Sequence, residues 1–424
     1  MSAPLTYDQW LNHIRTHSMF YRTQLSHLPV HGCEFHQLPI VNLSEYWKDS
    51  HDLDHWPVLT SRVKDALVFK TGGTTSEGKL SVYTHAEWQL MLDCFGRSLT
   101  AQLAAGDRIA NLFFSGDLYA SFLFIHGALC SVDVAITEFP FSGSVELDVL
   151  ADAIAGHRIN VLVGVPAHLL AFASHVIGKG RRLPQITTVL FGGENLFESQ
   201  MPTLKRAFPG ARFASIGYAS VDAGLVGAST PDCGLGEHRV FDQHTRVEIV
   251  DDLSGEAIEA IGQAGNLVVT NFNRTLMPIV RYPVGDRASW CEPAGTPGRK
   301  FALRGRSAES RRVRVGVLSL FPEEISDIAR RVAGGVQWQL IIEHSQGNDC
   351  VLLKWLPEKA EDAGPTRSHA LKAALIEQYP GLDRLHVDTQ ACTAQDLERH
   401  PRSGKHLSII DRRVYGSRAP EDAG

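Results

Sequence analysis

The chain has 424 residues, of which 44% are hydrophobic and 21% are charged, a balance typical of a globular protein with a full core. The net charge of −6, without a long basic run, argues against nucleic acid as the main partner. The seven cysteines form no C-x-x-C pair, and no apolar run reaches the roughly 18 residues of a membrane span. No apolar signal segment opens the chain, so we expect a cytoplasmic protein.

Residues 1–60 predict a helical lead-in that is rich in histidine and aromatic residues. After it, the β-prone runs 66–69 and 80–84 predict two strands, and residues 70–79 between them are mostly Gly, Ser, Thr and Lys. Such a loop can wrap phosphates. Glycines let backbone N–H groups approach an anion, hydroxyls add donors, and lysine adds positive charge.

Residues 73–79 match G-x-x-x-x-G-K, the core of the P-loop of NTPases. That motif requires Ser or Thr next and then a helix, whereas here Leu80 begins a strand. The helix begins only after the capping box formed by Thr84 and Glu87. The sequence therefore favours a phosphate loop of another kind, on a strand–loop–strand hairpin, with an ordinary glycine-rich turn as the alternative.

Between residues 65 and 230, short β-prone runs alternate with helical ones, which predicts βαβ crossovers and a largely buried sheet. In such sheets, ligands bind beyond the carboxyl ends of the strands. The predicted strands are 108–114, 160–165 and 187–191, and the predicted helices include 145–156, 167–178 and 198–207.

From residue 235 to 303 the chain becomes β-rich, which predicts a smaller barrel or sheet. A basic, polar segment follows, and then an α+β tail. We therefore expect an α/β fold. Its large N-terminal domain (1–303) combines βαβ-type sheets with a small β-barrel-like part, a hinge covers 304–312, and a small mobile C-terminal domain covers 313–424.

Residues 71–79 resemble, nearly position for position, the T-S-G-T-T-G-x-P-K loop of the adenylate-forming enzymes, which include acyl-CoA synthetases and adenylation domains. Two positions differ, because Ser76 replaces a glycine and Gly78 replaces the proline. Neither change removes a phosphate donor, although Gly78 makes the tip of the loop more flexible.

Further segments resemble motifs of that family in the family's order. The short chain and its Asp-Arg-Arg ending are most similar to the phenylacetate–CoA ligase group. The matching segments are the adenine-lining turn at 191–194, the ribose motif at 281–286, the hinge motif at 303–307, the opening of the small domain at 315–325, and the catalytic-lysine segment at 401–405 with its close at 409–413.

The resemblance implies that ATP activates a carboxylic acid, of the aromatic class, to an acyl-adenylate with release of pyrophosphate. Coenzyme A then forms a thioester after the small domain rotates about the hinge. Lys79 and the loop hydroxyls would neutralise the β- and γ-phosphates, unless the loop is only a hairpin turn. The loop residues assigned to the nucleotide are Thr71, Gly72, Gly73, Thr74 and Thr75.

The resemblance also assigns residues to the base and the sugar. Gly192, Gly193 and Glu194 would line the adenine, and Glu194 could also cap a helix that begins near Leu196. Asp286 would accept hydrogen bonds from both ribose hydroxyls, with an ordinary turn aspartate as the alternative. Arg306 would pair with ribose or phosphate, unless it is simply solvated.

The Y-G-x-T/S-E motif of the family corresponds here to a segment with Tyr218, Ala219 and Ser220 as the adenylate clamp. Asp222 aligns with the acid that holds Mg²⁺, and we prefer it because a hard cation needs a carboxylate oxygen. The alternative register puts Ser220 at the acid position.

Lys405 corresponds to the catalytic lysine, which would bridge the carboxylate oxygen and the α-phosphate. Ser403 and Gly404 before it make a flexible tip, and a solvated loop lysine is the alternative. The basic run 304–314 could receive the 3′-phosphate of coenzyme A, or be only a solvated hinge.

The sequence also contains candidate residues for an acid pocket and for a metal site. Cys233, His238 and His244 could hold a structural zinc, but their spacing is irregular. Residues expected near the acid, and not separable from the core by sequence, are Phe114, Tyr119, His126, Phe139, Pro140 and 165–168.

Two other functions stay open. Adenylation could be followed by amide formation or by transfer to a carrier protein, and the chain could instead be a non-catalytic sensor. Lys79, Asp286 and Lys405 argue against a sensor. Homodimers are common in the resembled group, but the sequence does not indicate the oligomeric state.

Overall fold

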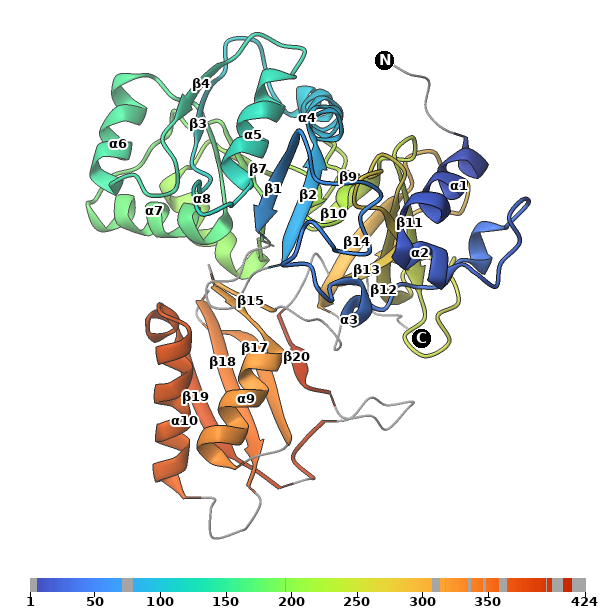
Figure 1. The fold of residues 1–424 in the computed structure, drawn as a ribbon. Coiled ribbons are helices and arrows are strands. Elements are labelled where there is room, and N and C mark those ends of the chain that lie inside the picture. Colours follow the sequence, from blue (N-terminus) through green and yellow to red (C-terminus); the bar gives the residue numbers. More distant parts are fainter. Residues whose placement is uncertain are drawn as a thin grey trace, which may run out of the picture.

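The computed structural model describes residues 6–70, 79–194, 196–306, 313–316, 318–334, 337–345, 348–357, 364–393, 395–398 and 407–413. A large N-terminal domain and a small C-terminal domain meet across one face (Figure 1). In the part of the chain that is described, no helix has the length and hydropathy needed to span a membrane.

A five-stranded parallel sheet forms one half of the large domain, in the order β4-β3-β5-β6-β7. The crossovers contain helices because parallel strands cannot be joined by a tight turn. All four residues of β5 are buried, as expected for a strand covered on both faces. The elements are β3 (Arg108–Asn111), α5 (Ser121–Cys130), β4 (Thr137–Pro140), α6 (Leu147–Gly156), β5 (Val161–Gly164), α7 (Pro166–Gly178), β6 (Thr188–Phe191), α8 (Met201–Ala207) and β7 (Arg212–Ser215).

The predicted strand–loop–strand hairpin is present. Strand β1 (Ala66–Lys70) pairs antiparallel with β2 (Leu80–Thr84), and Lys70 lies opposite Leu80. Helix α4 (His85–Leu99) follows at once, with the expected capping box between Thr84 and Glu87. A strand after the loop excludes the strand–loop–helix geometry of a P-loop.

The second half of the large domain is a seven-stranded antiparallel sheet, in the order β11-β12-β13-β14-β10-β9-β8. Among the described strands, the two edges β11 and β8 do not pair with each other, so the expected barrel-like part is an open sheet. Its strands are β8 (Tyr218–Ser220), β9 (Gly224–Ala228), β10 (Glu237–Val240), β11 (Thr245–Val250), β12 (Ala264–Asn271), β13 (Ile279–Trp290) and β14 (Lys300–Arg306).

The N-terminal helices belong to the core of this second half. Tyr21 and Tyr46 both donate hydrogen bonds to the carbonyl of Pro278, at 2.8 and 3.0 Å. The indole of Trp47 donates to the hydroxyl of Tyr282 at 3.0 Å. These buried polar tips find partners as burial requires. The helices are α1 (Tyr7–His17), α2 (Met19–Gln24) and α3 (Leu43–Tyr46).

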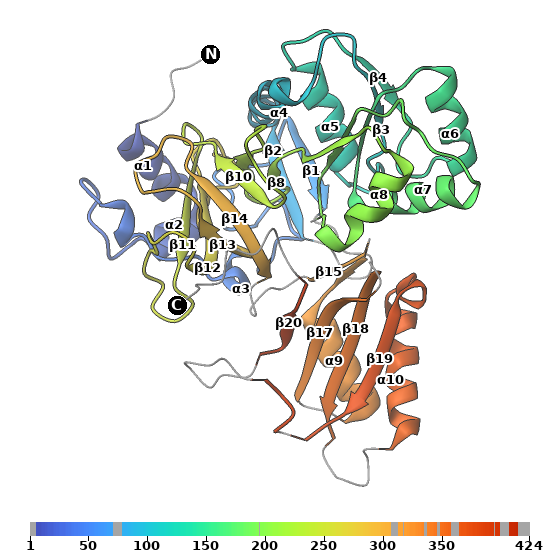
Figure 2. The same cartoon turned by 180° about the vertical axis from the view of Figure 1, so that it is seen from behind.

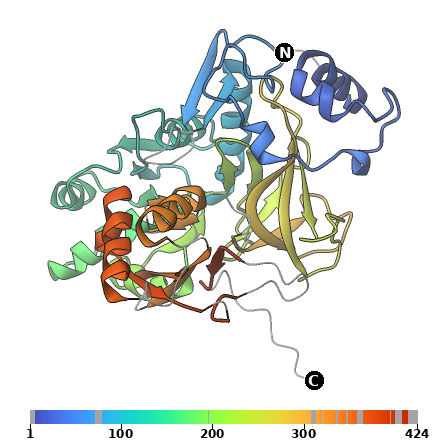
Figure 3. The same cartoon turned by 60° about the horizontal axis from the view of Figure 1, so that its bottom comes forward.

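The small domain has its own core and a four-stranded sheet in the order β19-β18-β17-β20. It lies below the junction of the two large sheets in Figures 1 and 2, and in Figure 3 this lower part of the molecule is tilted forward. Its elements are β15 (Val313–Val315), β16 (Leu318–Leu320), α9 (Pro322–Ala333), β17 (Gln337–Ser345), β18 (Asn348–Leu356), α10 (Pro365–Gln378), β19 (His386–Ala391) and β20 (Ile409–Asp411).

Short 3₁₀ helices complete the described structure, and β14 runs three residues past the predicted domain boundary at residue 303. The assignment of 304–312 as a hinge stays a prediction. The 3₁₀ helices are η1 (Phe35–Gln37), η2 (Thr100–Gln102), η3 (Glu198–Gln200) and η5 (Leu382–Arg384).

Candidate functional site

A cavity of about 770 Å³ lies between the two domains, at the carboxyl ends of the parallel strands. Its walls come from α4, α5 and α7, from the turn after β6, from β8 and β13, and from the small domain. This is the edge at which open α/β sheets bind ligands. One cavity therefore contains most of the described residues that the sequence assigned to the nucleotide.

Asp286 and Tyr218 meet at one wall of the cavity. The Tyr218 hydroxyl donates to Oδ2 of Asp286 at 2.5 Å, and Asp286 is 7% exposed. The β13–β14 pairing shifts register between Asp286 and Ala288, and Gly285 before it has φ of 82°. A bulge of this kind turns a side chain out of the regular alternation. The Arg306 backbone lies opposite Asp286 in that register.

The glycine turn after β6 borders the same cavity. Gly193 has φ of 78°, and a Cβ on Gly192 would lie 2.5 Å from a methyl carbon of Ile216. Only glycine fits this turn without displacing its neighbours. The turn thus lets the backbone come close to whatever occupies the cavity.

The side chain of Glu194 is 8% exposed and links three elements. Its Oε2 accepts a hydrogen bond from the backbone N–H of Ala167 in the first turn of α7 at 3.3 Å, and its Oε1 lies 3.5 Å from Arg314 of the small domain. Burial raises the pKa of Glu194, while the charge of Arg314 opposes the shift. The predicted cap on a helix near Leu196 is wrong, because the carboxylate bonds to α7 instead.

The clamp segment also lines the cavity, with Tyr218, Ala219, Ser220 and Asp222. The Ser220 hydroxyl accepts from the N–H of Ala223 at 2.8 Å, and Oδ2 of Asp222 accepts from the Tyr282 hydroxyl at 3.2 Å. In nucleotide sites, Mg²⁺ is commonly held by one or two carboxylates together with phosphate oxygens. A carboxylate facing the cavity fits that donor set.

The apolar end of the cavity is made by α4 and α5. Trp88, Met91 and Phe95 follow one another at helical spacing along α4, and Phe124 and Ile125 face them from α5. None of these five residues was predicted from the sequence. The spacing of 88, 91 and 95 directly after the phosphate loop was the available signal, but the same spacing is typical of any core helix.

The expected acid-pocket residues are only partly present. Tyr119, Pro166 and Ala167 line the cavity. His126 instead pairs with Glu138 at 2.7 Å, and Phe139 stacks on the rings of Phe141 and His157. Val165 is a core residue. Phe114, Pro140 and His168 are likewise absent from the described lining.

The two lysines of the phosphate and catalytic-lysine motifs differ, because the structure describes Lys79 but not Lys405. Lys79 is described, and its Nζ lies 5.3 Å from the ring centre of Trp47. It is absent from the described lining of the cavity. Lys405 and the loop residues 71–78 lie outside the described residues. Their assigned roles stay predictions.

The three proposed zinc ligands lie apart. Cys233 contacts Thr230 at 3.3 Å, His238 Nε2 contacts the hydroxyl of Ser215 at 3.1 Å, and His244 contacts Cys94. No group of three or more His, Cys, Asp or Glu that could hold a metal occurs in the described ranges. The zinc hypothesis therefore finds no support.

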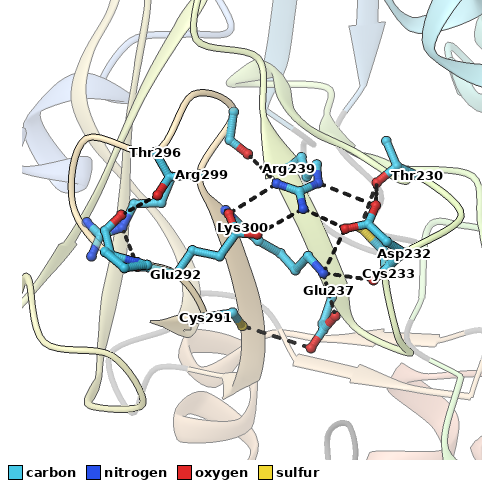
Figure 4. A network of polar contacts seen from close by, with 12 residues as sticks. Thr230, Asp232, Cys233, Glu237, Arg239, Cys291, Glu292, Thr296, Arg299 and Lys300 are labelled. Atoms are coloured by element: carbon cyan, nitrogen blue, oxygen red, sulfur yellow. Dashed lines mark hydrogen bonds and ion pairs between the residues drawn. The ribbon is translucent and has the colours of Figure 1, made fainter.

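Cys233 instead borders a charged network between β10 and β14 (Figure 4). The guanidinium of Arg239 contacts Asp232 at 2.5 Å and Glu292 at 2.9 Å, and Lys300 contacts Asp232 at 3.0 Å. Hydrogen bonds from Arg239 hold the pKa of Asp232 far below its usual range. This network ties down the segment that leads to His238.

His238 is 3% exposed and packs against the rings of Tyr218 and Phe301, with centroid distances of 5.7 Å to each, while those two ring centres lie 6.2 Å apart. Burial lowers its pKa to about 4, and the carbonyl of Gly236 opposes the shift. The imidazole at this wall of the cavity is therefore neutral at neutral pH.

The fold and the cavity define the class of protein. The chain superimposes on a 2-hydroxyisobutyryl-CoA ligase in its thioesterification state with a TM-score of 0.67, over 96% of this chain and 88% of that one, at 16% sequence identity. The same ligase in its postadenylation state gives 0.58 over 95% and 87%. The chain therefore has the fold of the adenylate-forming enzymes.

Residues 34–277, more than half of the chain, match the family model described as AMP-binding enzyme. The chain belongs to this family, and the resemblance found in the sequence is confirmed. It is 23% identical to a phenylacetate-coenzyme A ligase of Aromatoleum evansii, over 83% of this chain and 80% of the relative. It is 29% identical to an indoleacetate–lysine synthetase of Pseudomonas savastanoi, over 32% and 31%.

Proposed function

We propose that the protein is an AMP-forming ligase that activates an aromatic carboxylic acid with ATP and transfers the acyl group to coenzyme A. The main support is that one cavity contains an apolar end at Trp88 and Phe95, a hydrogen-bonding wall at Tyr218 and Asp286, and a wall from the small domain. An acyl-adenylate needs these parts, because its acyl group requires an apolar surface and its ribose hydroxyls require hydrogen-bond acceptors.

The first half-reaction is the attack of the carboxylate on the α-phosphorus of ATP, with pyrophosphate as the leaving group. Charge grows on the phosphoryl oxygens, so the protein contributes mainly positive charge, N–H donors and positioning. Asp286 would accept from the ribose hydroxyls while Tyr218 fixes its orientation. Lys405 would neutralise charge on the α-phosphate, and Lys79 with residues 71–75 would bind the leaving phosphates.

Asp222 would hold Mg²⁺ together with phosphate oxygens. The metal would supply positive charge near the leaving pyrophosphate. Tyr282 keeps the Asp222 carboxylate in place through its hydrogen bond of 3.2 Å.

The apolar end supports an aromatic acid as the substrate. Its described walls from α4 and α5 consist of Trp88, Met91, Phe95, Ser121, Phe124 and Ile125, none of which carries a charge. Such walls favour a flat hydrocarbon ring over a charged or strongly hydrated side chain. The phenylacetate–coenzyme A ligase relative agrees with this class of acid.

The arrangement of the domains supports transfer to coenzyme A. The better superposition on the thioesterification state than on the postadenylation state of one ligase, with TM-scores of 0.67 and 0.58, favours an arrangement of the transfer type. Gly316, Asp349 and Arg413 of the small domain line the cavity. None of the described residues from His386 to Arg412 does so.

Amide formation is the second candidate. The local similarity to an indoleacetate–lysine synthetase favours it, because that relative is named for joining an acid to an amine. Both candidates share the adenylation step and differ only in the acceptor.

The test is a screen of carboxylic acids for ATP-dependent pyrophosphate release, run with coenzyme A, with lysine and without an acceptor. We expect release with phenylacetate or a related aryl acid, and a coenzyme A thioester identified by mass. An acyl-lysine product would establish the second candidate. The absence of an adenylate from every acid would reject both.

A further inference from the structure

Phe197 of the large domain forms a contact point at the domain interface. It precedes η3, is 5% exposed and lines the cavity close to the glycine turn. Its ring centre lies 4.1 Å from that of His344 in the small domain, at an interplanar angle of 84°. The guanidinium of Arg413 lies 5.3 Å from the same ring centre. Two cation-capable side chains thus meet one aromatic ring across the interface.

His344 is held by its own domain. It lies directly opposite Asp349 in the β17–β18 pairing, and its Nε2 contacts Oδ1 of Asp349 at 2.7 Å. Oδ2 of Asp349 accepts from the N–H of Gly316 at 2.6 Å and from Arg413 at 3.0 Å. Arg413 also pairs with Asp411 at 2.7 Å. One carboxylate therefore connects three segments of the small domain.

This cluster is buried. The side chains of Asp349 and Arg413 are 7% and 5% exposed, and that of His344 is 11% exposed. Buried charges of this kind persist when they are paired and hydrogen-bonded, and then fix one geometry. Gly316, Asp349 and Arg413 line the cavity, whereas His344 is absent from its described lining. Any effect of His344 on the reaction must therefore pass through the residues that it contacts, Asp349 and Phe197, which both line the cavity.

We propose that His344 is a positioning residue for the acyl-transfer half-reaction, because it docks the Asp349–Arg413 cluster onto Phe197 in the large domain. This inference rests on the proposed function. The contact fixes where Gly316, Asp349 and Arg413 stand around the acyl-adenylate when the acceptor attacks. Adenylation uses Lys405 from another segment of the small domain and does not need this contact.

The test separates the two half-reactions for His344→Leu. Adenylation is followed as pyrophosphate release with phenylacetate, or with whichever acid the screen identifies. Transfer is followed as decay of preformed acyl-adenylate after coenzyme A is added. We expect transfer to slow by about tenfold, as for loss of one coupled contact, and adenylation to stay within about twofold.

Two further variants sharpen the result. His344→Arg can donate to Asp349 and pack on the Phe197 ring, so it should restore transfer. His369→Leu makes the same chemical change at an exposed position of α10 and should change neither half-reaction. Equal loss in both half-reactions, or unaltered transfer in His344→Leu, would overturn the proposal.

Hydrogen–deuterium exchange provides a readout that does not depend on activity. Peptides covering Phe197 should exchange faster in His344→Leu than in wild type or His369→Leu, because the docking contact is lost. Unaltered exchange would also count against the contact. If none of the acids in the screen makes the wild-type protein release pyrophosphate, the proposed function is wrong. The exchange experiment then still shows whether His344 docks the two domains.

Discussion

The cavity has two walls that are anchored in different ways. The large-domain wall, with Tyr218, His238 and Asp286, belongs to one sheet and is hydrogen-bonded between neighbouring strands. The small-domain wall, with Asp349 and Arg413, is tied together within its own domain. Among the described residues, charged and aromatic contacts across the interface join Arg314 to Glu194, and His344 and Arg413 to Phe197.

This difference suggests that the large-domain wall serves nucleotide binding and the small-domain wall serves the chemical steps. A wall built into a continuous sheet keeps its shape when a second domain moves, so it suits the nucleotide, which must stay bound through both half-reactions. A wall that is attached by a few side-chain contacts can move away, and another surface of the same domain can take its place, as in hinge-type domain motions. Variants in the two walls should therefore affect different measurable quantities.

The largest effect is expected from the small domain, in Lys405→Ala. Loss of a charge aimed at the transition state of phosphoryl transfer typically lowers the rate by about 10²- to 10³-fold. We expect acid-dependent pyrophosphate release to fall by this factor. Binding of ATP, measured by calorimetry, should change by less than about twofold, because we assign the nucleotide to the large domain.

Lys354→Ala is a matched control within the same domain. Lys354 lies on β18, and its Nζ donates to the carbonyl of Asp396 at 3.1 Å. It should leave both quantities unaltered. If Lys405→Ala weakened ATP binding as strongly as it slowed adenylation, the assignment of chemistry to the small domain and binding to the large domain would be wrong.

His238 in the large-domain wall makes the stability of the fold depend on pH. Its pKa of about 4 in the folded protein is below the ordinary value of 6.5, so the unfolded chain binds more protons between these values. Stability from the neutral imidazole is present above pH 6.5 and is lost as the pH falls toward 4. The full loss is ~3 kcal/mol, from the size of the shift.

Urea unfolding at pH 7, 6 and 5 measures this effect. As the pH is lowered, we expect the free energy of unfolding to decrease more steeply in wild type than in His238→Asn. The asparagine keeps a partner for the Ser215 hydroxyl and does not titrate. His369→Asn, at an exposed histidine, should keep the wild-type slope. Identical slopes for wild type and His238→Asn would contradict the buried neutral imidazole.

The predictable parts of this molecule are those set by local pattern. The β-prone runs around the phosphate loop and the capping box at Thr84 led to the hairpin and α4 that the structure contains. The order of motifs along the chain led to the correct family. Short-range pairing and capping depend on neighbouring residues, which a single sequence displays.

The parts that could not be predicted depend on contacts between distant segments. The helical spacing of Trp88 and Phe95 is typical both of core residues and of pocket residues, because a helix turns one apolar face inward in both cases. The pairing of Glu194 with Arg314 and of His344 with Phe197 arises only when two domains meet. The zinc hypothesis failed for the same reason, since Cys233, His238 and His244 diverge in space although they are near in sequence.

A moderate effect on binding is expected from Asp286→Asn. Loss of a charged acceptor weakens each hydrogen bond it makes, which corresponds to roughly 10- to 100-fold in affinity for a nucleotide with two ribose hydroxyls. We expect the dissociation constant for ATP to rise by this factor. The transfer rate from preformed adenylate should fall much less.

Tyr218→Phe tests the orientation of that carboxylate separately. It removes the 2.5 Å hydrogen bond but leaves the charge on Asp286, so the rise in the ATP dissociation constant should be smaller than in Asp286→Asn. A larger effect in Tyr218→Phe would mean that the tyrosine itself, rather than the aspartate, carries most of the recognition.

The smallest effect is expected from Arg239→Met, which removes the centre of the network behind the large-domain wall. Its guanidinium is about a quarter exposed, with a side-chain exposure of 24%, and surface ion pairs contribute at most ~1 kcal/mol each. We expect a loss of ~1 kcal/mol in the free energy of unfolding from the network, and an ATP dissociation constant within about threefold of wild type. Arg331→Met, on an exposed position of α9, should change neither. If Arg239→Met weakened ATP binding more than Asp286→Asn does, the wall would depend on its supporting charges rather than on the continuity of its sheet, and the contrast between the two walls would fail.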